Sequence, residues 1–135
     1  MNFKTEEEHM VSLVQNVTQS SEVSGDELEF LLSMRSKGKI SFLVIDIREM
    51  HEYSTLSIKG TDYLLPTSTI HTTLDQLTKY KNQLMIFYCR TASRTFQMIH
   101  ILKRMGFTNI AHLSRGIVEY KGEKLKNAPL PSSKK

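Results

Sequence analysis

The chain opens with two segments in which apolar residues recur at helical spacing. The first covers residues 4–18. The second begins after Ser24, which Glu27 follows at the spacing of a capping box, and Gly38 is placed to end it. The apolar stripe is Met10, Leu13, Val14 and Val17 in the first helix, and Leu28, Leu31, Leu32 and Met34 in the second.

Short apolar runs follow, each of the length of a strand. They cover residues 42–46, 62–65, 84–88 and 110–113. The run at 42–46 is continuously apolar up to Asp46, which is typical of a strand covered on both faces. We therefore expect four strands in this part of the chain.

Helical patterns lie between and after these runs. Residues 72–80 place Leu74 and Leu77 on one side, and a last helical turn is expected at 116–121. Residues 95–105 repeat apolar positions that we expect to be buried, namely Phe96, Ile99, Leu102 and Met105. Strands that alternate with helices predict an α/β fold, with a central, mostly parallel sheet flanked by helices.

The pattern also divides the chain. We expect one domain over residues 21–125 and an N-terminal helical extension over residues 1–20. From Gly122 on, the pattern gives the chain little reason to pack, and residues 126–135 are expected to form a flexible basic tail. A length of 135 residues suits one domain with an ordinary core.

Composition is that of a soluble globular protein, with 39% hydrophobic and 24% charged residues. No apolar run is long enough to span a membrane, so we expect no membrane partner. The start of the chain lacks the pattern of a secretory signal. A single cysteine cannot form an internal disulfide, so we expect a reducing, cytoplasmic location.

The net charge of +4 is unevenly distributed along the chain. Residues 1–67 contain 6 Lys and Arg against 11 Asp and Glu, which gives −5, whereas residues 68–135 contain 12 against 3, which gives +9. The basic half favours anionic ligands, although lysines near the C-terminus supply much of its excess. Basic residues do not interleave with aromatic residues along one face, so we expect no nucleic-acid partner.

Cys89 lies between the strand at 84–88 and the helix at 95–105, and Arg90 and Arg94 lie in the turn that connects them. The start of a helix carries partial positive charge and unpaired N–H groups, which favour a thiolate and bind oxyanions. Arginine side chains add full positive charges in a geometry suited to oxygen atoms. The turn therefore predicts a reactive thiolate that handles a small anion.

Arg48 follows the strand at 42–46, much as Cys89 follows its own strand. Both residues are therefore expected at the carboxyl edge of the sheet, where ligands bind in such folds. We interpret Asp46 and Arg48 as structural residues near the site. The five histidines show no ligand spacing, so no metal site is expected.

Four segments of the chain match short motifs of one protein family. Residues 89–95, Cys-Arg-Thr-Ala-Ser-Arg-Thr, resemble the active-site loop of single-domain rhodaneses, whose common form is Cys-Arg-Thr-Gly-Asn-Arg-Ser. Residues 43–53 resemble its LIDVREPEEY strand, residues 58–61 its HIPGA segment, and residues 113–117 its L-x-G-G turn. The segments follow one another in the family's order, and the resemblance runs from Glu22 to Lys124.

The resemblance implies a rhodanese-like fold and sulfurtransferase activity without a metal or organic cofactor. Cys89 would take the sulfane sulfur of thiosulfate or a related anionic persulfide donor, hold it as a persulfide, and pass it to a thiol or to cyanide. No second cysteine is present, so the acceptor would be an external small molecule or protein. The implied substrate-binding residues are Arg90, Arg94, Thr91, Ala92, Ser93 and Thr95, the arginines through their side chains and the loop through its N–H groups.

Two alternatives stay open. Ala92 stands where the family's loop has glycine, and alanine is strained there if the turn needs a positive φ. One alternative is therefore a persulfide carrier without turnover, or a rhodanese-fold binding module. The other is a phosphatase or an arsenate reductase, whose related loops place five residues between cysteine and arginine. Four residues separate Cys89 from Arg94, which favours sulfur chemistry.

Overall fold

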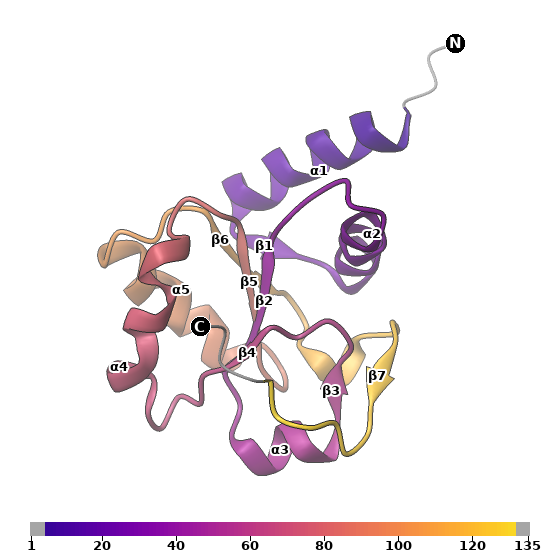
Figure 1. Ribbon diagram of the computed structural model, residues 1–135. Coiled ribbons are helices and arrows are strands. Elements are labelled where there is room, and N and C mark those ends of the chain that lie inside the picture. The colour runs from indigo at the N-terminus through magenta and orange to yellow at the C-terminus, as the bar shows by residue number, and fades with distance from the viewer. Residues whose placement is uncertain (1–4, 132–135) are drawn as a thin grey trace.

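The computed structural model describes residues 5–131 and contains a five-stranded sheet in the order β1-β6-β5-β2-β4 (Figure 1). Its strands are β1 (Glu22–Val23), β2 (Leu43–Asp46), β4 (Tyr63–Leu64), β5 (Met85–Tyr88) and β6 (Ile110–Leu113). Neighbouring strands in this sheet are parallel throughout. The predicted α/β fold with a mostly parallel sheet is confirmed.

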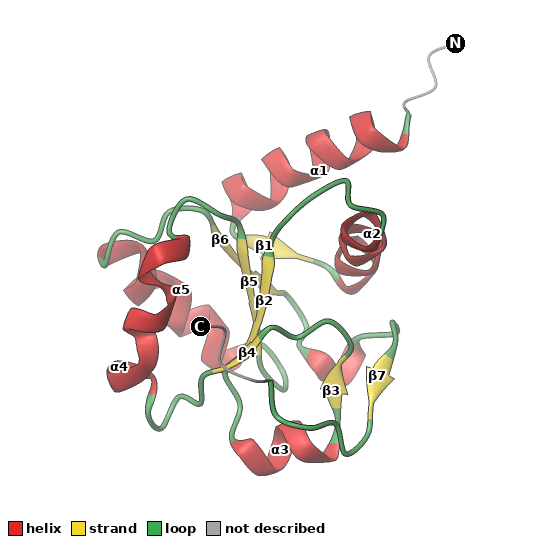
Figure 2. Ribbon diagram, in the orientation of Figure 1, coloured by secondary structure: helices red, strands yellow, loops and turns green. Residues whose placement is uncertain are grey.

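Helices cover both faces of the sheet (Figure 2). On one face lie α1 (Glu6–Ser20) and α2 (Gly25–Ser36), and on the other lie α4 (Ile70–Thr73), the 3-10 helix η1 (Leu74–Tyr80) and α5 (Ser93–Arg104). Along β5, Ile86 and Tyr88 point into the first core, whereas Met85 and Phe87 point into the second. This alternation is the two-residue period of a strand buried on both faces.

The two N-terminal helices begin with complete capping boxes. Thr5 pairs with Glu8 at the start of α1, and Ser24 pairs with Glu27 at the start of α2, as the sequence predicts for the second helix. The apolar stripe of α1 belongs to the first core, through Met10, Leu13 and Val17. The N-terminal helix is therefore packed against the domain.

The start and the buried face of helix α5 differ from the sequence prediction. It begins at Ser93 rather than at residue 95, and its buried stripe is Thr95, Ile99 and Leu102. The prediction that Phe96 and Met105 are buried is wrong, because they are 57% and 50% exposed. Phe96 lies one position round the helix from the buried stripe, and Met105 caps the end of the helix.

The segment after Gly122 also differs from the expectation. Strand β7 (Lys124–Leu125) pairs antiparallel with β3 (Ser57–Ile58), and the N–H of Asn127 donates to the carbonyl of Ser54 at 2.8 Å. The prediction of a chain with little reason to pack from Gly122 on is therefore wrong. Backbone hydrogen bonds hold this segment, and an apolar side-chain pattern does not reveal them.

Two short elements complete the chain at the carboxyl edge of the sheet. Helix α3 (Met50–Thr55) follows β2, and the 3-10 turn η2 (Ile117–Glu119) lies within the predicted last helical turn. The tail predicted for residues 126–135 is described only to residue 131, since residues 132–135 lie outside the described residues. Within residues 5–131, no helix has the length and apolar character needed to cross a membrane.

Candidate active site

Cys89 and Arg48 follow neighbouring strands at the carboxyl edge of the sheet. Cys89 comes directly after β5, which is hydrogen-bonded to β2, and the chain enters α5 at Ser93. The strand-turn-helix arrangement expected around Cys89 is therefore present. In α/β sheets this edge is where ligands bind.

The turn after Cys89 leaves a cluster of backbone N–H groups without backbone acceptors. The first hydrogen bond of α5 runs from the N–H of Phe96 to the carbonyl of Ala92, at 2.9 Å. No backbone hydrogen bond within residues 5–131 uses the N–H groups of residues 91–95 as donors. Donors at the start of a helix have no intrahelical partner, so this cluster is suited to hold an anion.

Ala92 has a left-handed backbone, with φ 84° and ψ −8°. The φ of Ala92 is therefore positive, the case in which we expected alanine to be strained. This region favours glycine over residues with a Cβ atom. The cost is about 1 kcal/mol. The chain nevertheless completes the turn and places Ala92 as the N-cap residue of α5.

A second turn packs against the cysteine loop from β6. The N–H of Ile117 donates to the carbonyl of Cys89 at 3.0 Å, and the N–H of Val118 donates to the carbonyl of Arg90 at 3.2 Å. Gly116 precedes them with φ 72°, and a Cβ atom there would collide with the carbonyl of Arg90. Glycine at this position therefore permits the close approach of the two turns.

The thiol of Cys89 has no exposed surface, at 0%, and its side chain packs in the apolar cluster that includes Phe87 and Ile99. Its Sγ lies 3.6 Å from Oγ1 of Thr95. The Thr95 hydroxyl also lies 3.2 Å from the carbonyl oxygen of Ala92 and 2.8 Å from Nδ1 of His112. Sequence reasoning missed His112, whose one signal is a polar residue inside the apolar run of β6.

Arg94 forms an ion pair with Glu52 of α3. Its Nη2 and Nη1 donate to the two carboxylate oxygens at 3.1 and 3.3 Å. Hydrogen bonding to Glu52 raises the pKa of Arg94. Burial opposes ionisation of Glu52, but hydrogen bonds from Arg94 and from the backbone of Glu49 outweigh it and lower the pKa of that carboxyl. The carboxylate of Glu52 therefore neutralises part of the positive charge of Arg94, which we had expected to bind an anionic sulfur donor.

Sequence reasoning also missed Glu52. Its signal is the Glu49–Glu52 spacing at the start of α3, a capping box directly after the β2 edge. The N–H of Glu49 donates to Oε2 of Glu52 at 2.9 Å, so the carboxylate is held toward the cysteine loop.

Arg90 is exposed and forms no ion pair within residues 5–131. It lines a cavity of about 440 Å³ beside the loop, and neighbours in its lining include Arg48, His51, Glu52 and Lys124. Cations outnumber carboxylates there, which favours an anionic ligand. Thr91 and Ser93 are exposed as well, on the outer side of the loop.

The Asp46–Arg48 pair ties the end of β2 to the segment after α3. Nη2 of Arg48 donates to Oδ2 of Asp46 at 2.8 Å and to the carbonyl of Leu56 at 2.6 Å. Burial raises the pKa of the Asp46 carboxyl, and hydrogen bonds from Arg48 oppose that rise. Both side chains are buried, so these contacts fit the structural interpretation of the pair.

The chain was also compared with models of known protein families. The profile of the rhodanese-like domain matches residues 27–123, which include β2, the cysteine loop and β6. The chain belongs to the rhodanese-like domain family.

Among curated proteins, this rhodanese-like domain is similar to "Probable adenylyltransferase/sulfurtransferase MoeZ" of Mycobacterium tuberculosis. The two are 29% identical over 77 residues, which cover 57% of this chain and 19% of the relative. The chain thus spans about a fifth of the length of the curated relatives it matches.

Solved structures show the same fold. A rhodanese from E. coli with anions has a TM-score of 0.55 at 22% identity, covering 64% of this chain and 99% of that one. A rhodanese-like domain protein from Staphylococcus aureus has a TM-score of 0.59 at 20% identity, with 76% and 92% covered. The rhodanese-like domain of the Alr3790 protein from Anabaena has a TM-score of 0.64 at 19% identity, with 78% and 79% covered.

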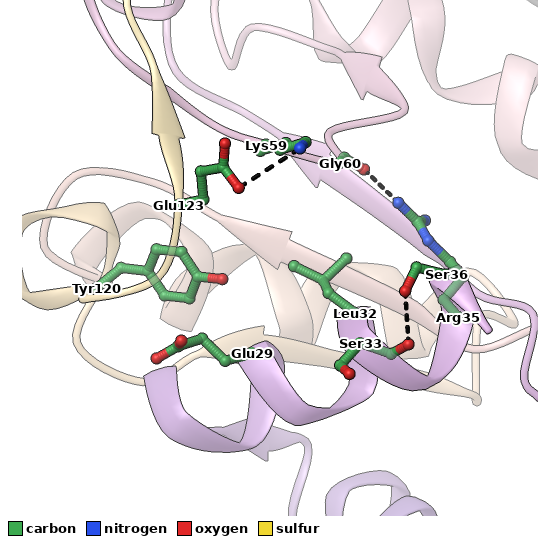
Figure 3. Close-up of a pocket in the computed structure, with 9 residues that line it drawn as sticks. All are labelled: Glu29, Leu32, Ser33, Arg35, Ser36, Lys59, Gly60, Tyr120 and Glu123. Carbon is green, nitrogen blue, oxygen red and sulfur yellow. Dashed lines mark hydrogen bonds and ion pairs between the residues drawn. The ribbon is translucent and has the colours of Figure 1, made fainter.

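The rhodanese-like domain has another cavity, of about 450 Å³, between α2 and the segments around β3 and β7 (Figure 3). Its lining comprises Glu29, Leu32, Ser33, Arg35, Ser36, Lys59, Gly60, Tyr120 and Glu123. Lys59 pairs with Glu123 at 3.4 Å, and Nη2 of Arg35 donates to the carbonyl of Gly60 at 2.8 Å. These cations already have partners and the cysteine loop is not part of the lining, so the candidate site is the one around Cys89.

The part of the chain that the structure describes contains no candidate metal site. Within residues 5–131, no group of three or more His, Cys, Asp or Glu side chains is arranged to hold an ion.

Proposed function

We propose that this rhodanese-like domain is a sulfurtransferase that carries sulfur as a persulfide on Cys89. The observation that carries the proposal is the turn at residues 89–95, in which Cys89 is followed directly by a cluster of unpaired N–H groups at the start of α5. The family match and the similarity to a sulfurtransferase support sulfur transfer over other anion chemistry.

In the first half-reaction, the Cys89 thiolate attacks the outer sulfur of thiosulfate. A new S–S bond forms, the S–S bond of thiosulfate breaks, and sulfite leaves with the bonding electron pair. We infer that Arg90 holds the sulfonate oxygens, because it is exposed and without an ion pair in residues 5–131. The N–H groups of residues 91–95 stabilise the negative charge on the remaining persulfide.

In the second half-reaction, an external thiolate or cyanide attacks the outer sulfur of the persulfide. The bond to Cys89 breaks and the Cys89 thiolate is regenerated, so atoms and charge balance over the cycle. Cys89 is the only cysteine of the chain, which makes the acceptor a small molecule or another protein. A reducing compartment such as the cytoplasm supplies such thiols and suits a chain with one unpaired cysteine.

Access to the sulfur is part of the proposed cycle. Cys89 has no exposed surface, and its side chain belongs to the apolar cluster on the α5 side of the sheet. We infer that the turn at residues 89–95 has to move before a donor reaches Sγ. We expect turnover to depend on the mobility of the loop as well as on the reactivity of the thiolate.

Thiocyanate formation from thiosulfate and cyanide tests the proposal. The wild-type domain is expected to form thiocyanate with saturation in both substrates, and Cys89→Ser is expected to form none. Circular dichroism of Cys89→Ser shows whether the variant keeps the fold. Equal rates for the wild type and a folded Cys89→Ser would refute a role for the thiol.

A persulfide carrier or binding module is the second candidate, and two observations favour it. Cys89 is fully buried, and Glu52 already occupies the Arg94 guanidinium. This candidate predicts that sulfur is loaded once but released slowly. A burst of sulfite equal to the amount of protein, followed by negligible thiocyanate formation, would distinguish it from an enzyme with turnover.

Phosphatase or arsenate reductase chemistry is less well supported. Four residues separate Cys89 from Arg94, so the loop is one residue shorter than those enzymes require. We expect no Cys89-dependent hydrolysis of a generic aryl phosphate. Robust hydrolysis that is lost in Cys89→Ser would overturn the argument from loop length.

A further inference from the structure

Three buried side chains connect the cysteine loop to strand β6. Sγ of Cys89 lies 3.6 Å from Oγ1 of Thr95, which lies 2.8 Å from Nδ1 of His112. The exposed fractions of Cys89, Thr95 and His112 are 0%, 0% and 4%. A thiol, a hydroxyl and an imidazole therefore form a continuous hydrogen-bonded row that is shielded from water.

We propose that this row is a proton relay in which His112 takes the proton of Cys89 through the hydroxyl of Thr95. The proposal rests on the function proposed above for Cys89 and names the group that generates its thiolate. His112 acts through Thr95 and does not touch the donor, so it is a positioning and proton-holding residue.

The relay balances without an outside reactant. Before ionisation, the thiol of Cys89 donates to Oγ1 of Thr95, and the hydroxyl of Thr95 donates to the unprotonated Nδ1 of His112. Each proton then moves one place along the row. Cys89 becomes a thiolate, Thr95 keeps one hydroxyl proton and donates it to the sulfur, and His112 becomes an imidazolium. The carbonyl of Ala92, at 3.2 Å, is the more distant competitor for the Thr95 hydroxyl.

The surroundings of His112 suit this task. Burial lowers the pKa of His112, which favours the neutral ring at rest and opposes its protonation, so the relay needs a negative charge nearby to hold the imidazolium. On β1, Oε2 of Glu22 lies 3.8 Å from Nε2, and its charge favours the imidazolium once it forms. The charge of His100 on α5 opposes that protonation. Phe96 of α5 lies edge-on to the ring at 6.3 Å, and β5 contributes the apolar Phe87 opposite His112.

The pKa of the Cys89 thiol tests the relay independently of sulfur transfer. The thiolate is titrated by its ultraviolet absorbance, with Cys89→Ser subtracted to remove the contribution of tyrosines. His112→Asn retains a hydrogen-bonding amide near Nδ1 but cannot take a proton, and Thr95→Val retains the shape without the hydroxyl. In both variants we expect the thiol pKa to rise by about one unit or more.

Two further variants serve as controls. Thr95→Ser retains the hydroxyl, so its thiol pKa is expected to stay close to that of the wild type. His71→Asn alters an exposed histidine on α4, on an element that is not part of the row, and is expected to leave the titration unchanged.

The relay would be overturned if folded His112→Asn or Thr95→Val titrated like the wild type. If both variants fail to fold, Glu22→Gln decides, because this exposed carboxylate is not part of the core. We then expect a smaller rise of the same sign, and an unchanged thiol pKa contradicts the relay. A wild-type domain that takes no sulfur from thiosulfate refutes the proposed function, while the titration still reports on the relay.

Discussion

The guanidinium of Arg94 donates to both carboxylate oxygens of Glu52, at 3.1 and 3.3 Å. The arginine that closes the cysteine loop is therefore bound to α3 instead of standing free for a donor. This pair is about a quarter exposed, with side-chain exposures of 33% and 20%. The anion affinity of the loop consequently depends on Glu52 as well as on its two arginines.

Replacing Glu52 by glutamine should lower the KM for thiosulfate. The amide retains an acceptor for the N–H of Glu49 but removes a negative charge beside the anion site, which is worth about 1 kcal/mol, or about fivefold. The effect should shrink as salt is added, because exposed charges are screened. Steady-state kinetics at two ionic strengths measure it.

Glu123→Gln is the matched control for this change. Glu123 also pairs with a cation, Lys59, but lies in the cavity of Figure 3. Its KM should equal that of the wild type. A higher KM in Glu52→Gln would contradict the account, since it would mean that Glu52 holds Arg94 in its binding position.

Gly116→Ala and Gly38→Ala distinguish two ways in which a Cβ atom lowers stability, namely backbone strain at positive φ and collision with a neighbouring turn. Both glycines have a similar positive φ, 72° and 75°, but a Cβ atom on Gly116 meets the carbonyl of Arg90, whereas one on Gly38 meets nothing within 4 Å. Gly38→Ala should lower the free energy of unfolding by about 1 kcal/mol. Gly116→Ala should cost about 2 kcal/mol more and slow sulfur loading. Urea unfolding of both variants measures the difference, and equal losses would show that the two turns are not in contact.

Ala92→Gly should stabilise the domain. Glycine adopts the φ of 84° without strain, which outweighs the added entropy of the unfolded chain, so the free energy of unfolding should rise by about 0.5 kcal/mol. Ala128→Gly is the control: its φ is not positive, so it should be neutral or destabilising. Thermal unfolding of both variants is the measurement. A destabilised Ala92→Gly would show that the methyl group contributes more by packing than it costs in strain.

The stability of the domain should fall in mild acid because of His112. Burial lowers its pKa below the usual 6.5, so below that value the unfolded chain binds a proton that the folded chain does not. The contribution of His112 to the free energy of unfolding is therefore fully present above the unfolded pKa and is lost as the pH falls toward the folded pKa. His112→Asn should flatten the stability curve below about pH 6.5 and leave it unchanged above that value. Urea midpoints across this range that are equally steep in both proteins would contradict the prediction.

Local patterns predicted four of the five strands of the main sheet, but not β1, and most helices. The capping box at Ser24 and the apolar runs that form β2, β5 and β6 depend on residues close in sequence. The strand-turn-helix arrangement of Cys89 follows from the same kind of signal. The burial of Phe96 was mispredicted because Thr95, four residues before Ile99 on the same face, takes the inward position of the first turn and leaves Phe96 outside.

The residues that contact Arg94 and Thr95 could not be predicted from the sequence. Glu52 lies 42 positions from Arg94, and His112 lies 17 positions from Thr95, so tertiary packing alone brings them together. The burial of Cys89 was hidden for the same reason. Strands β7 and β3 pair through backbone hydrogen bonds, which depend little on the type of side chain. The sequence pattern therefore does not predict this pairing.

The most direct test of sulfur transfer through Cys89 is the mass of the intact protein after incubation with thiosulfate. We expect the wild type to gain the mass of one sulfur atom on a peptide that contains Cys89, and cyanide or a small thiol to remove it. Cys89→Ser should gain nothing under the same conditions. An unmodified wild-type protein, or the same gain in Cys89→Ser, would contradict sulfur transfer through Cys89.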